Sequence, residues 1–483
     1  MRATSLLGID LGTGSTKAVL LDADGCVAGR GAVTHAVRTT RRGWAESDPE
    51  DWWRSIGGAV RAAVGSRASD VGAIGLCGQM HGVVLLDARG RALRAAILWA
   101  DTRATEELAA YRSLPESEAR VLGNPLVPGM AGPILLWLRD NEPDTYTAAV
   151  WALQPKDWLH QRLTATIATD PSDASATLLY DVYYDTRSEA VIQRLGLRSE
   201  LFPPVVASVA VVGELGSEAA QALGVNRGIP VVVGAADTAA AMLGSGLLGS
   251  RDAQLTVGTG AQLVVDRAQM QPDPQLATHM FRTPSTQGWY AMAAMQNAGL
   301  ALEWCLRVLG RDWEWAYDHA FAVPPGAEGL TFLPYLSGER TPRMDPHARG
   351  AWLGLGLDHG PPAMMRAAFE GVAYAIRDGL DALLRAGHRA DALRMIGGGT
   401  LDTRWRQLLA DVLGRPLVPV DAPDASARGA ALLAGLGTGL IPEAAQHPPT
   451  MGRAVEPGPS SPAYAQGLTR FRRLGAPAPA DGL

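Results

Sequence analysis

Two short segments of the chain combine an apolar run, a Gly-Thr-Gly turn and a second apolar run. The first covers residues 6–21 with Gly12-Thr13-Gly14 at its turn, and the second covers residues 254–265 with Gly258-Thr259-Gly260. Each pattern predicts a β-hairpin with a glycine-rich turn. Glycine lacks a Cβ, so backbone N–H groups can close around an anion, and Thr and Ser hydroxyls add donors. One such hairpin in each half of the chain predicts two related lobes that hold parts of one polyphosphate, and therefore a two-lobed enzyme that uses ATP.

Two aspartates stand at the ends of expected strands. Asp10 precedes the first glycine turn, where a carboxylate can hold Mg²⁺ beside phosphate oxygens, although an aspartate in a turn is also a common structural feature. Asp237 follows the apolar run 229–234 and precedes an expected helix. It suits two roles: a helix N-cap, or the base that accepts a proton from an attacking hydroxyl. Its position alone leaves both open.

Three polar or glycine-rich loops follow other expected strands. Residues 78–82 place an amide, a thioether and an imidazole between two glycines, a set of donors and acceptors suited to a polyol. Residues 99–103 contain Asp101 and Arg103, for which a salt bridge is the simpler interpretation. Residues 397–399 are three consecutive glycines, which suit an adenine or ribose platform but equally a plain strand-to-helix turn.

Composition excludes several classes of protein. The chain has 483 residues, of which 47% are hydrophobic, so at least two domains are expected, and 55 glycines and 32 prolines suit an α/β protein. A net charge of −6 without a run of basic residues gives no sign of a nucleic-acid-binding surface. Three widely spaced cysteines argue against a disulfide or zinc framework, and no apolar run approaches the roughly 20 residues that span a bilayer. We expect a soluble, cytoplasmic protein.

The elements that would position these residues alternate strands and helices. A helix is expected over 49–64 after Asp48, and further helices over 296–309, 361–387, 402–413 and 425–435. The glycine-rich segment 244–249 separates two expected domains, residues 1–245 and 246–483. The end beyond about residue 455 is rich in Pro, Gly and Ala and is expected to be mobile, apart from a short basic helix over 463–474.

Together these residues resemble the FGGY family of carbohydrate kinases, and most of all its members that phosphorylate D-xylulose. The resemblance runs from Leu6 to about Gly439. Its most specific parts are the Gln-Met-His block at 79–81 and the Tyr-Leu-Ser-Gly-Glu-Arg-Thr-Pro block at 335–342. Other matching motifs lie at 10–13, 43–53, 97–103, 155–157, 172–175, 370–374 and 396–399.

The resemblance implies an α/β fold of two actin-like (ribonuclease H-like) domains with a cleft between them. The first domain would hold the sugar and the catalytic base, and the second would hold most of the nucleotide. Asp237 becomes the catalytic base, and Asp10 the carboxylate on the magnesium side. The substrate contacts implied are Gln79, Met80, His81, Asp101, Arg103, Asp237 and Thr238. The ATP contacts implied are Gly12, Thr13, Gly14, Ser15, Lys17, Gly258, Thr259, Gly260, Gly299, Glu303, Gly398, Gly399 and Thr403.

Three positions depart from the pattern and bear on the exact sugar. Thr238 stands where Asn often follows the base, Ile134 replaces a familiar Lys, and Ala100 replaces an Asn. The leading expectation is ATP- and Mg²⁺-dependent phosphorylation of D-xylulose to D-xylulose 5-phosphate. A kinase of another pentulose or polyol, and a non-catalytic nucleotide-switched sugar sensor, are the alternatives. The expected partners are the sugar and ATP, without nucleic acid or membrane, and a homodimer is a candidate assembly.

Overall fold

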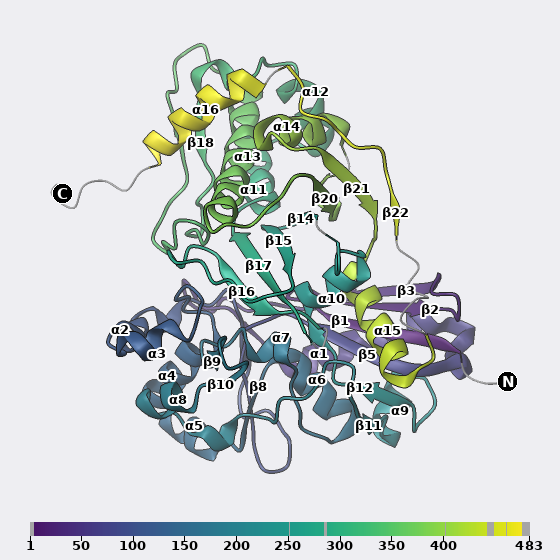
Figure 1. Ribbon diagram of the computed structural model, residues 1–483. Helices are drawn as coiled ribbons and strands as arrows, with labels where there is room; N and C mark the ends of the chain where they lie inside the picture. The colour runs from purple at the N-terminus through teal and green to yellow at the C-terminus, as the bar shows by residue number, and fades with distance from the viewer. Residues whose placement is uncertain are drawn as a thin grey trace.

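Each glycine-rich hairpin belongs to a seven-stranded mixed sheet, and the two sheets form the lower and upper halves of the molecule in Figure 1. The computed structural model describes residues 4–250, 252–284, 287–400, 402–441, 449–459 and 461–475. Both predicted hairpins are confirmed: Leu11 pairs with Thr16 across the first turn, and Val257 pairs with Ala261 across the second.

The first sheet holds the first hairpin near its middle. Its edge order runs β11, β12, β5, β1, β2, β3, with β13 also paired to β5. The strands are β1 (Ser5–Leu11), β2 (Ser15–Leu21), β3 (Val27–Thr34), β5 (Val71–Gly78), β11 (Val211–Glu214), β12 (Pro230–Val232) and β13 (Ala235–Ala236). Short two-stranded pairs beside it involve β4 (Glu46–Ser47), β6 (Val84–Leu86), β7 (Ala96–Ile97), β8 (Trp151–Leu153), β9 (Tyr180–Asp181) and β10 (Thr186–Arg187).

The second sheet holds the second hairpin. Its order is β16, β17, β15, β14, β20, β21, β22. The strands are β14 (Ala253–Val257), β15 (Ala261–Arg267), β16 (His279–Arg282), β17 (Trp289–Met295), β20 (Leu393–Ile396), β21 (Leu417–Asp421) and β22 (Thr450–Met451). A small pair, β18 (Thr331–Leu333) and β19 (Ala351–Leu353), lies apart from it.

The two sheets repeat one arrangement of five strands. In each, the hairpin strands are antiparallel, a third antiparallel strand lies beyond the second hairpin strand, and two parallel strands follow on the other side. Asp10 is paired with Lys17 in the first sheet, and the corresponding pair in the second sheet is Thr256 with Gln262. The structure therefore contains two related lobes, as the paired glycine turns predict.

Helices cover the sheets and fill the junction between them (Figure 1). Those of the first half are α1 (Pro49–Val64), α2 (Leu108–Arg112), α3 (Glu116–Arg120), α4 (Ala131–Asn141), α5 (Pro143–Ala148), α6 (Pro155–Thr164), α7 (Pro171–Ala174), α8 (Glu189–Arg194), α9 (Ser217–Leu223) and α10 (Asp237–Gly244). Those of the second half are α11 (Gly299–Leu309), α12 (Trp313–Ala320), α13 (Pro361–Arg385), α14 (Thr403–Leu413), α15 (Ala425–Thr438) and α16 (Ser461–Leu474).

The helix α15 belongs to the second half of the sequence but packs on the first sheet. A Cβ on Gly75 of β5 would lie 1.8 Å from the carbonyl oxygen of Ala430, so only glycine admits the helix this close. The same helix packs on α10, where a Cβ on Gly429 would lie 1.8 Å from the carbonyl oxygen of Ala240. Two helices of small residues therefore cross at the junction and bring the ends of both sheets together.

The long helices begin and end close to their predicted limits. Helix α1 begins at Pro49, and the Asp48 side chain accepts a hydrogen bond from the amide of Glu50, as expected of an N-cap. The short helix predicted near the end of the chain is present as α16, which buries Tyr464, Leu468 and Phe471. Residues 476–483 lie outside the described residues. Among the residues that the structure describes, no helix is long and apolar enough to cross a bilayer.

Candidate functional site

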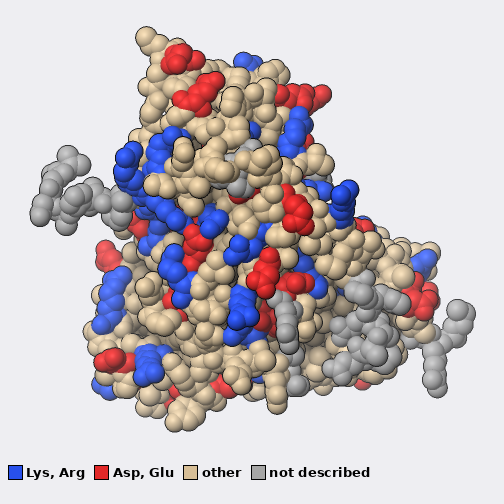
Figure 2. Space-filling model, turned by 45° about the horizontal axis from the view of Figure 1, so that its top comes forward, with Lys and Arg blue, Asp and Glu red and all other residues tan. Residues whose placement is uncertain are grey.

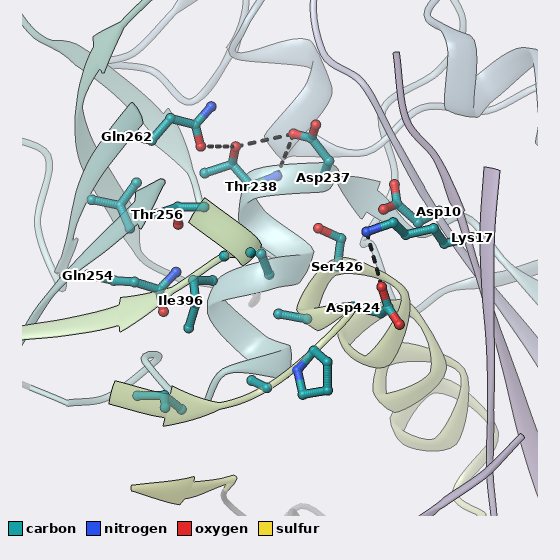
Figure 3. Close-up of a pocket in the computed structure, with 18 of the residues that line it drawn as sticks. Asp10, Lys17, Asp237, Thr238, Gln254, Thr256, Gln262, Ile396, Asp424 and Ser426 are labelled. Carbon is teal, nitrogen blue, oxygen red and sulfur yellow. Dashed lines mark hydrogen bonds and ion pairs between the residues drawn. The ribbon is translucent and has the colours of Figure 1, made fainter. Parts of the chain in front are cut away.

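A cavity of about 580 Å³ lies between the two sheets, beside the crossing of α10 and α15. Strand ends from both halves face it: Asp10 and Lys17 from the first hairpin, Thr256 and Gln262 from the second (Figure 3). Asp237 lies at the start of α10 and faces the same space. Sequence reasoning proposed Asp10, Lys17 and Asp237 as site residues, and the structure brings them to one cavity together with Thr256 and Gln262.

Asp10 is set up to bind a cation. Its pKa is raised to about 7, first by burial and then by the negative charge of Asp237, while Lys17 lowers it. Its Oδ1 is buried without a hydrogen-bond partner in the described part of the chain. An unpaired, desolvated carboxylate oxygen gains most from a hard cation, so this position fits Mg²⁺.

Asp237 has the environment of a general base. Burial raises its pKa to about 6, and hydrogen bonds from Thr238 limit that rise. The Thr238 amide donates to Oδ1 over 2.5 Å, and the Thr238 hydroxyl lies 3.2 Å from the same oxygen. Oδ1 is thus occupied by its neighbour, and a carboxylate with a pKa near 6 is ionised at neutral pH but basic enough to take a proton. No side-chain capping bond was found at the start of α10, so the N-cap interpretation of Asp237 is not supported.

A second cavity of about 230 Å³ adjoins the first and shares Asp237, Thr256 and Gln262 with it. Its other lining residues include Thr13, Met80, His81, Trp99, Gly258, Gly260, Gln296 and Arg340. It therefore combines the two glycine turns with the polar loop at 78–82. Because Asp237 faces both cavities, a group in the smaller one can reach a group in the larger one past this carboxylate.

His81 presents an acceptor to the smaller cavity. Its Nδ1 lies 2.7 Å from the carbonyl oxygen of Ala176, and burial together with the charge of Arg340 lowers its pKa to about 3. The ring is therefore neutral at pH 7. A carbonyl only accepts, so Nδ1 carries the proton and Nε2 is left as an acceptor. The backbone of His81 has a φ of 73°, and its amide donates to Gln154 Oε1 over 2.7 Å.

The glycine turns are held open by their neighbours. In the first, the Trp99 indole donates to the Thr13 hydroxyl over 2.9 Å, and the His35 ring reaches the Thr13 carbonyl at 3.0 Å. In the second, α11 starts directly behind the turn, and the amides of Ala298 and Leu300 donate to the Thr259 carbonyl. These amides fix the turn, so α11 contributes its dipole, and not free N–H groups, toward an anion beside the turn.

Part of the wall of the larger cavity is glycine-rich and apolar. Gly397 and Gly398 line it, and Ile396, Val420, Ala422 and Ala425 form a small apolar cluster beside them. Four other predicted nucleotide contacts do not line the larger cavity: Gly299, Glu303, Gly399 and Thr403. Thr403 begins α14, and Glu303 is exposed on α11.

The remaining predicted contacts have structural partners. Asp101 and Arg103 form an ion pair with Nη2 to Oδ2 at 2.7 Å, and both side chains are almost fully buried. Asp101 also accepts from the Ala45 amide, and neither residue lines the smaller cavity. Gln79 lies behind the first turn, with its amide nitrogen 3.4 Å from the Gly12 carbonyl. For Asp101 and Arg103 the salt bridge, the simpler of the two interpretations, describes the geometry.

The three departures lie in different environments. Thr238 bonds Asp237 and lies 3.3 Å from the Gln262 side chain, so it shapes the cavity directly. Ile134 is fully buried on α4 within an apolar core. Ala100 lines a third cavity, next to the smaller one, that also contains Trp99 and Arg340.

Sequence reasoning missed three residues of the site. Asp424 pairs with Lys17, Nζ to Oδ1 at 3.0 Å, at the mouth of the larger cavity (Figure 3). Gln262 and Arg340 line the smaller cavity from the second half of the chain. The only signal for Arg340 was its place in the specific block at 335–342, and nothing local marks Gln262 or Asp424.

A buried charge cluster supports the strand end that precedes Asp237. Lys156 is fully buried, with Nζ 2.8 Å from Asp157, 2.9 Å from Asp170 and 3.3 Å from Asp173. Asp170 accepts from the Ser172 hydroxyl, which in turn accepts from the Ala236 amide over 2.9 Å. This network fixes the backbone next to Asp237.

Comparisons with known proteins agree with this geometry. The sequence models of the FGGY family of carbohydrate kinases match residues 5–244 (N-terminal domain) and 253–438 (C-terminal domain). Xylulose kinase of Escherichia coli (strain K12) is 37% identical over 414 residues, covering 85% of each chain. A crystal structure of a "xyloylose kinase" from Brucella ovis is 34% identical, covers 97% of this chain and 98% of that one, and has a TM-score of 0.88. Xylulose kinase from Rhodospirillum rubrum is 29% identical, with 97% and 98% covered and a TM-score of 0.85.

Proposed function

The chain belongs to the FGGY family of carbohydrate kinases, and we propose that it transfers the γ-phosphoryl group of ATP to D-xylulose, giving D-xylulose 5-phosphate and ADP. The observation that carries this proposal is the position of Asp237. It faces both the larger cavity, which can hold a polyphosphate, and the smaller one, which has the size and polarity for a pentose. A base at that point lies next to both the attacking hydroxyl and the γ-phosphate.

Asp237 takes the proton of the C5 hydroxyl as the oxygen bonds to the γ-phosphorus. The bond between the γ-phosphorus and the bridging oxygen then breaks, and ADP leaves with that electron pair. Thr238 occupies one oxygen of Asp237, which leaves Oδ2 for the incoming proton. Its pKa of about 6 matches a base that works near neutral pH.

The two glycine turns hold the phosphates from opposite sides. The first offers the Thr13 hydroxyl and the open turn at Gly14, and the second offers Gly258 and Gly260 backed by the N-terminus of α11. Lys17 lines the larger cavity, where its ammonium can leave Asp424 and bind a phosphate oxygen instead. The Ile396 and Val420 cluster with Gly397 and Gly398 gives the adenine an apolar wall.

Mg²⁺ is the metal that these residues fit. Asp10 is the carboxylate that would hold it, and the described residues contain no cluster of three or more His, Cys, Asp or Glu side chains that could form a complete protein cage. That donor set suits Mg²⁺, which keeps several waters and takes phosphate oxygens beside one or two carboxylates. When bound, the ion neutralises charge on the phosphates.

The sugar lies against Met80 and His81 in this proposal. Met80 is buried with its sulfur 3.7 Å from the Tyr290 hydroxyl, so it presents a fixed apolar surface to the carbon chain. His81 Nε2 accepts from a sugar hydroxyl.

Use of ATP and three free cysteines favour a cytoplasmic location. Acidic and basic side chains are interspersed on the face of the molecule shown in Figure 2. A homodimer remains part of the proposal.

A coupled assay of ADP release over ketoses, polyols and aldonates tests the function. We expect the highest kcat/KM with D-xylulose, and ³¹P NMR should identify phosphate on C5 of the product. A higher kcat/KM with another pentulose or with a polyol would assign the enzyme to that substrate instead. Absence of ADP release with every sugar, in folded protein that binds ATP, would favour the non-catalytic sensor.

A further inference from the structure

Arg340 is the one cationic side chain among the residues that line the smaller cavity. It comes from the loop after β18, in the second half of the chain, whereas Met80 and His81 come from the first half. It also lines the adjoining cavity that contains Trp99 and Glu339, so Arg340 is shared by the two cavities.

The charge of Arg340 has no carboxylate partner within ion-pair distance in the described part of the chain. Two other arginines with buried side chains differ: Arg103 pairs with Asp101 at 2.7 Å, and Arg366 pairs with Glu370 at 2.8 Å. Glu339 is next in sequence, but its Oε1 accepts from the amides of Gln296 and Arg340. The charge of Glu339 acts on the guanidinium from nearby, but among the described residues no carboxylate contacts it, so a ligand group that completes its hydrogen bonds gains free energy.

A neutral histidine fixes the guanidinium. Arg340 Nη2 lies 3.1 Å from His279 Nε2, and burial together with the charge of Arg340 keeps the pKa of His279 well below its usual range. Nε2 must therefore accept, since the arginine has only donors. The His279 ring stacks on Phe281 at 5.3 Å, and Phe281 contacts the His81 ring at 5.7 Å. Contacts through His279 and Phe281 thus connect Arg340 with His81, the proposed sugar contact.

The donors and acceptors around the cavity differ in what they can bind. His81 Nε2 and the Asp237 carboxylate only accept, so they select hydroxyl groups. The guanidinium of Arg340 only donates, and its Nε is buried without a partner in the described residues. A ketose has one oxygen that cannot donate a hydrogen bond, the carbonyl oxygen at C2. This oxygen needs a hydrogen-bond donor from the protein. A polyol has a hydroxyl there, which can also bond elsewhere.

We infer that Arg340 binds the C2 carbonyl oxygen of the sugar and so makes the enzyme prefer a ketose to the corresponding polyol. This inference rests on the proposed function, because it assumes a ketose in the smaller cavity. It also assigns a sugar contact to the second half of the chain, so the sugar site is complete only when both halves contribute.

The test compares D-xylulose with xylitol, its reduced form. Two variants are used: Arg340→Met, which removes the charge at similar length, and Arg340→Lys, which keeps the charge but loses the planar fork. Tryptophan fluorescence reports sugar binding without turnover, because Trp99 lines the cavity. We expect Arg340→Met to weaken D-xylulose binding at least about tenfold and xylitol binding less than about threefold, with Arg340→Lys between wild type and Met. The KM for ATP should be unchanged.

The matched control is Arg89→Met, an exposed arginine in the turn after β6. It should bind both sugars as wild type does, and near-wild-type melting temperatures show which variants are folded. An equal loss for both sugars, or no loss in folded Arg340→Met and Arg340→Lys, overturns the inference. A higher KM for ATP would place Arg340 on the phosphate instead. Failure of wild type to phosphorylate any ketose is a separate result, which refutes the proposed function.

Discussion

The carboxylates of Asp10 and Asp237 line one cavity, and the negative charge of Asp237 raises the pKa of Asp10. The two residues stand at different strand ends: Asp10 is on β1, and Asp237 follows β13, which pairs in parallel with β5 beside β1. Their closeness is costly without a ligand, since like charges in a desolvated site repel. A cation at Asp10 would remove that cost and leave Asp237 ionised for proton transfer.

Asp237→Asn should abolish the base while keeping the shape of the site. We expect turnover to fall by roughly 10²–10⁴-fold, with sugar and ATP binding retained. In wild type, kcat/KM should rise with pH through about 6 as Asp237 loses its proton. The pH–rate profile and single-turnover kinetics check this, and Glu116→Gln, an exposed change on α3 outside both cavities, is the control. A variant with near-normal turnover would show that another group takes the proton.

Asp10→Asn should change stability in a pH-dependent way. The pKa of Asp10 is raised in the folded protein, so the folded state binds more protons than the unfolded state between about pH 4 and 7. Wild type therefore loses stability as pH rises through this range, and the variant should not. We expect Asp10→Asn to be more stable at pH 8, by on the order of 1–3 kcal/mol, with little difference at pH 4. Urea unfolding at both pH values measures this, and a less stable variant at pH 8 would contradict it.

The same variant should weaken the use of magnesium. Asp10→Asn removes the charged oxygen that fits the ion, so about tenfold or more Mg²⁺ should be needed for half-maximal activity. Sugar binding in the absence of ATP should stay as in wild type, because Asp10 lines the larger cavity and not the smaller one. An unchanged Mg²⁺ requirement would move the metal to another ligand.

His81→Ala should raise the KM for the sugar and leave that for ATP nearly constant. Losing a buried hydrogen-bond partner costs about 1–3 kcal/mol, which is roughly 5- to 150-fold in KM. His81→Asn is the matched variant, because Asn tolerates the left-handed backbone and keeps an acceptor. The pKa of about 3 means that His81 itself adds no pH dependence between pH 5 and 8. Equal rises in both KM values would remove His81 from the sugar site.

Local patterns predicted the fold because its key features are local. The two hairpins follow from glycine turns between apolar runs, and α1 follows from Asp48 and Pro49. Asp10 and Asp237 were found for the same reason: each stands directly at a strand end. The packing of α15 on the first sheet had no such signal, because Gly75 and Ala430 meet only through tertiary structure.

The sugar site was harder to predict because it depends on contacts between distant residues. Arg340 reaches it from the second half, and its environment follows from His279 and from the lack of an ion pair with any carboxylate among the described residues. Asp101 and Arg103 show the opposite case: adjacent polar residues at a strand end satisfy each other and Ala45. A sequence gives the residue types, but not which of them keep unpaired atoms.

Sugar and nucleotide together should close the two lobes. Asp237 and the first glycine turn come before the segment 244–249, while the second turn and Gly397–Gly398 come after it. Gly246 and Gly249 both have positive φ, at 70° and 76°, so this segment can change backbone angles at positions where other residues would be strained. We expect small-angle scattering to give a smaller radius of gyration with D-xylulose and a non-hydrolysable ATP analogue than without ligands.

Variants of the segment separate a hinge from a rigid link. Gly249→Ala has open space for its Cβ and strains only the backbone, whereas Gly310→Ala makes the same change at the end of α11, also with open space and positive φ. If 249 lies in the hinge, Gly249→Ala should alter the ligand-induced change in radius, and Gly310→Ala should not. Closure excludes water, which would otherwise accept the phosphoryl group. Scattering profiles that stay identical with and without both ligands would mean that the lobes are already assembled for transfer before either substrate binds.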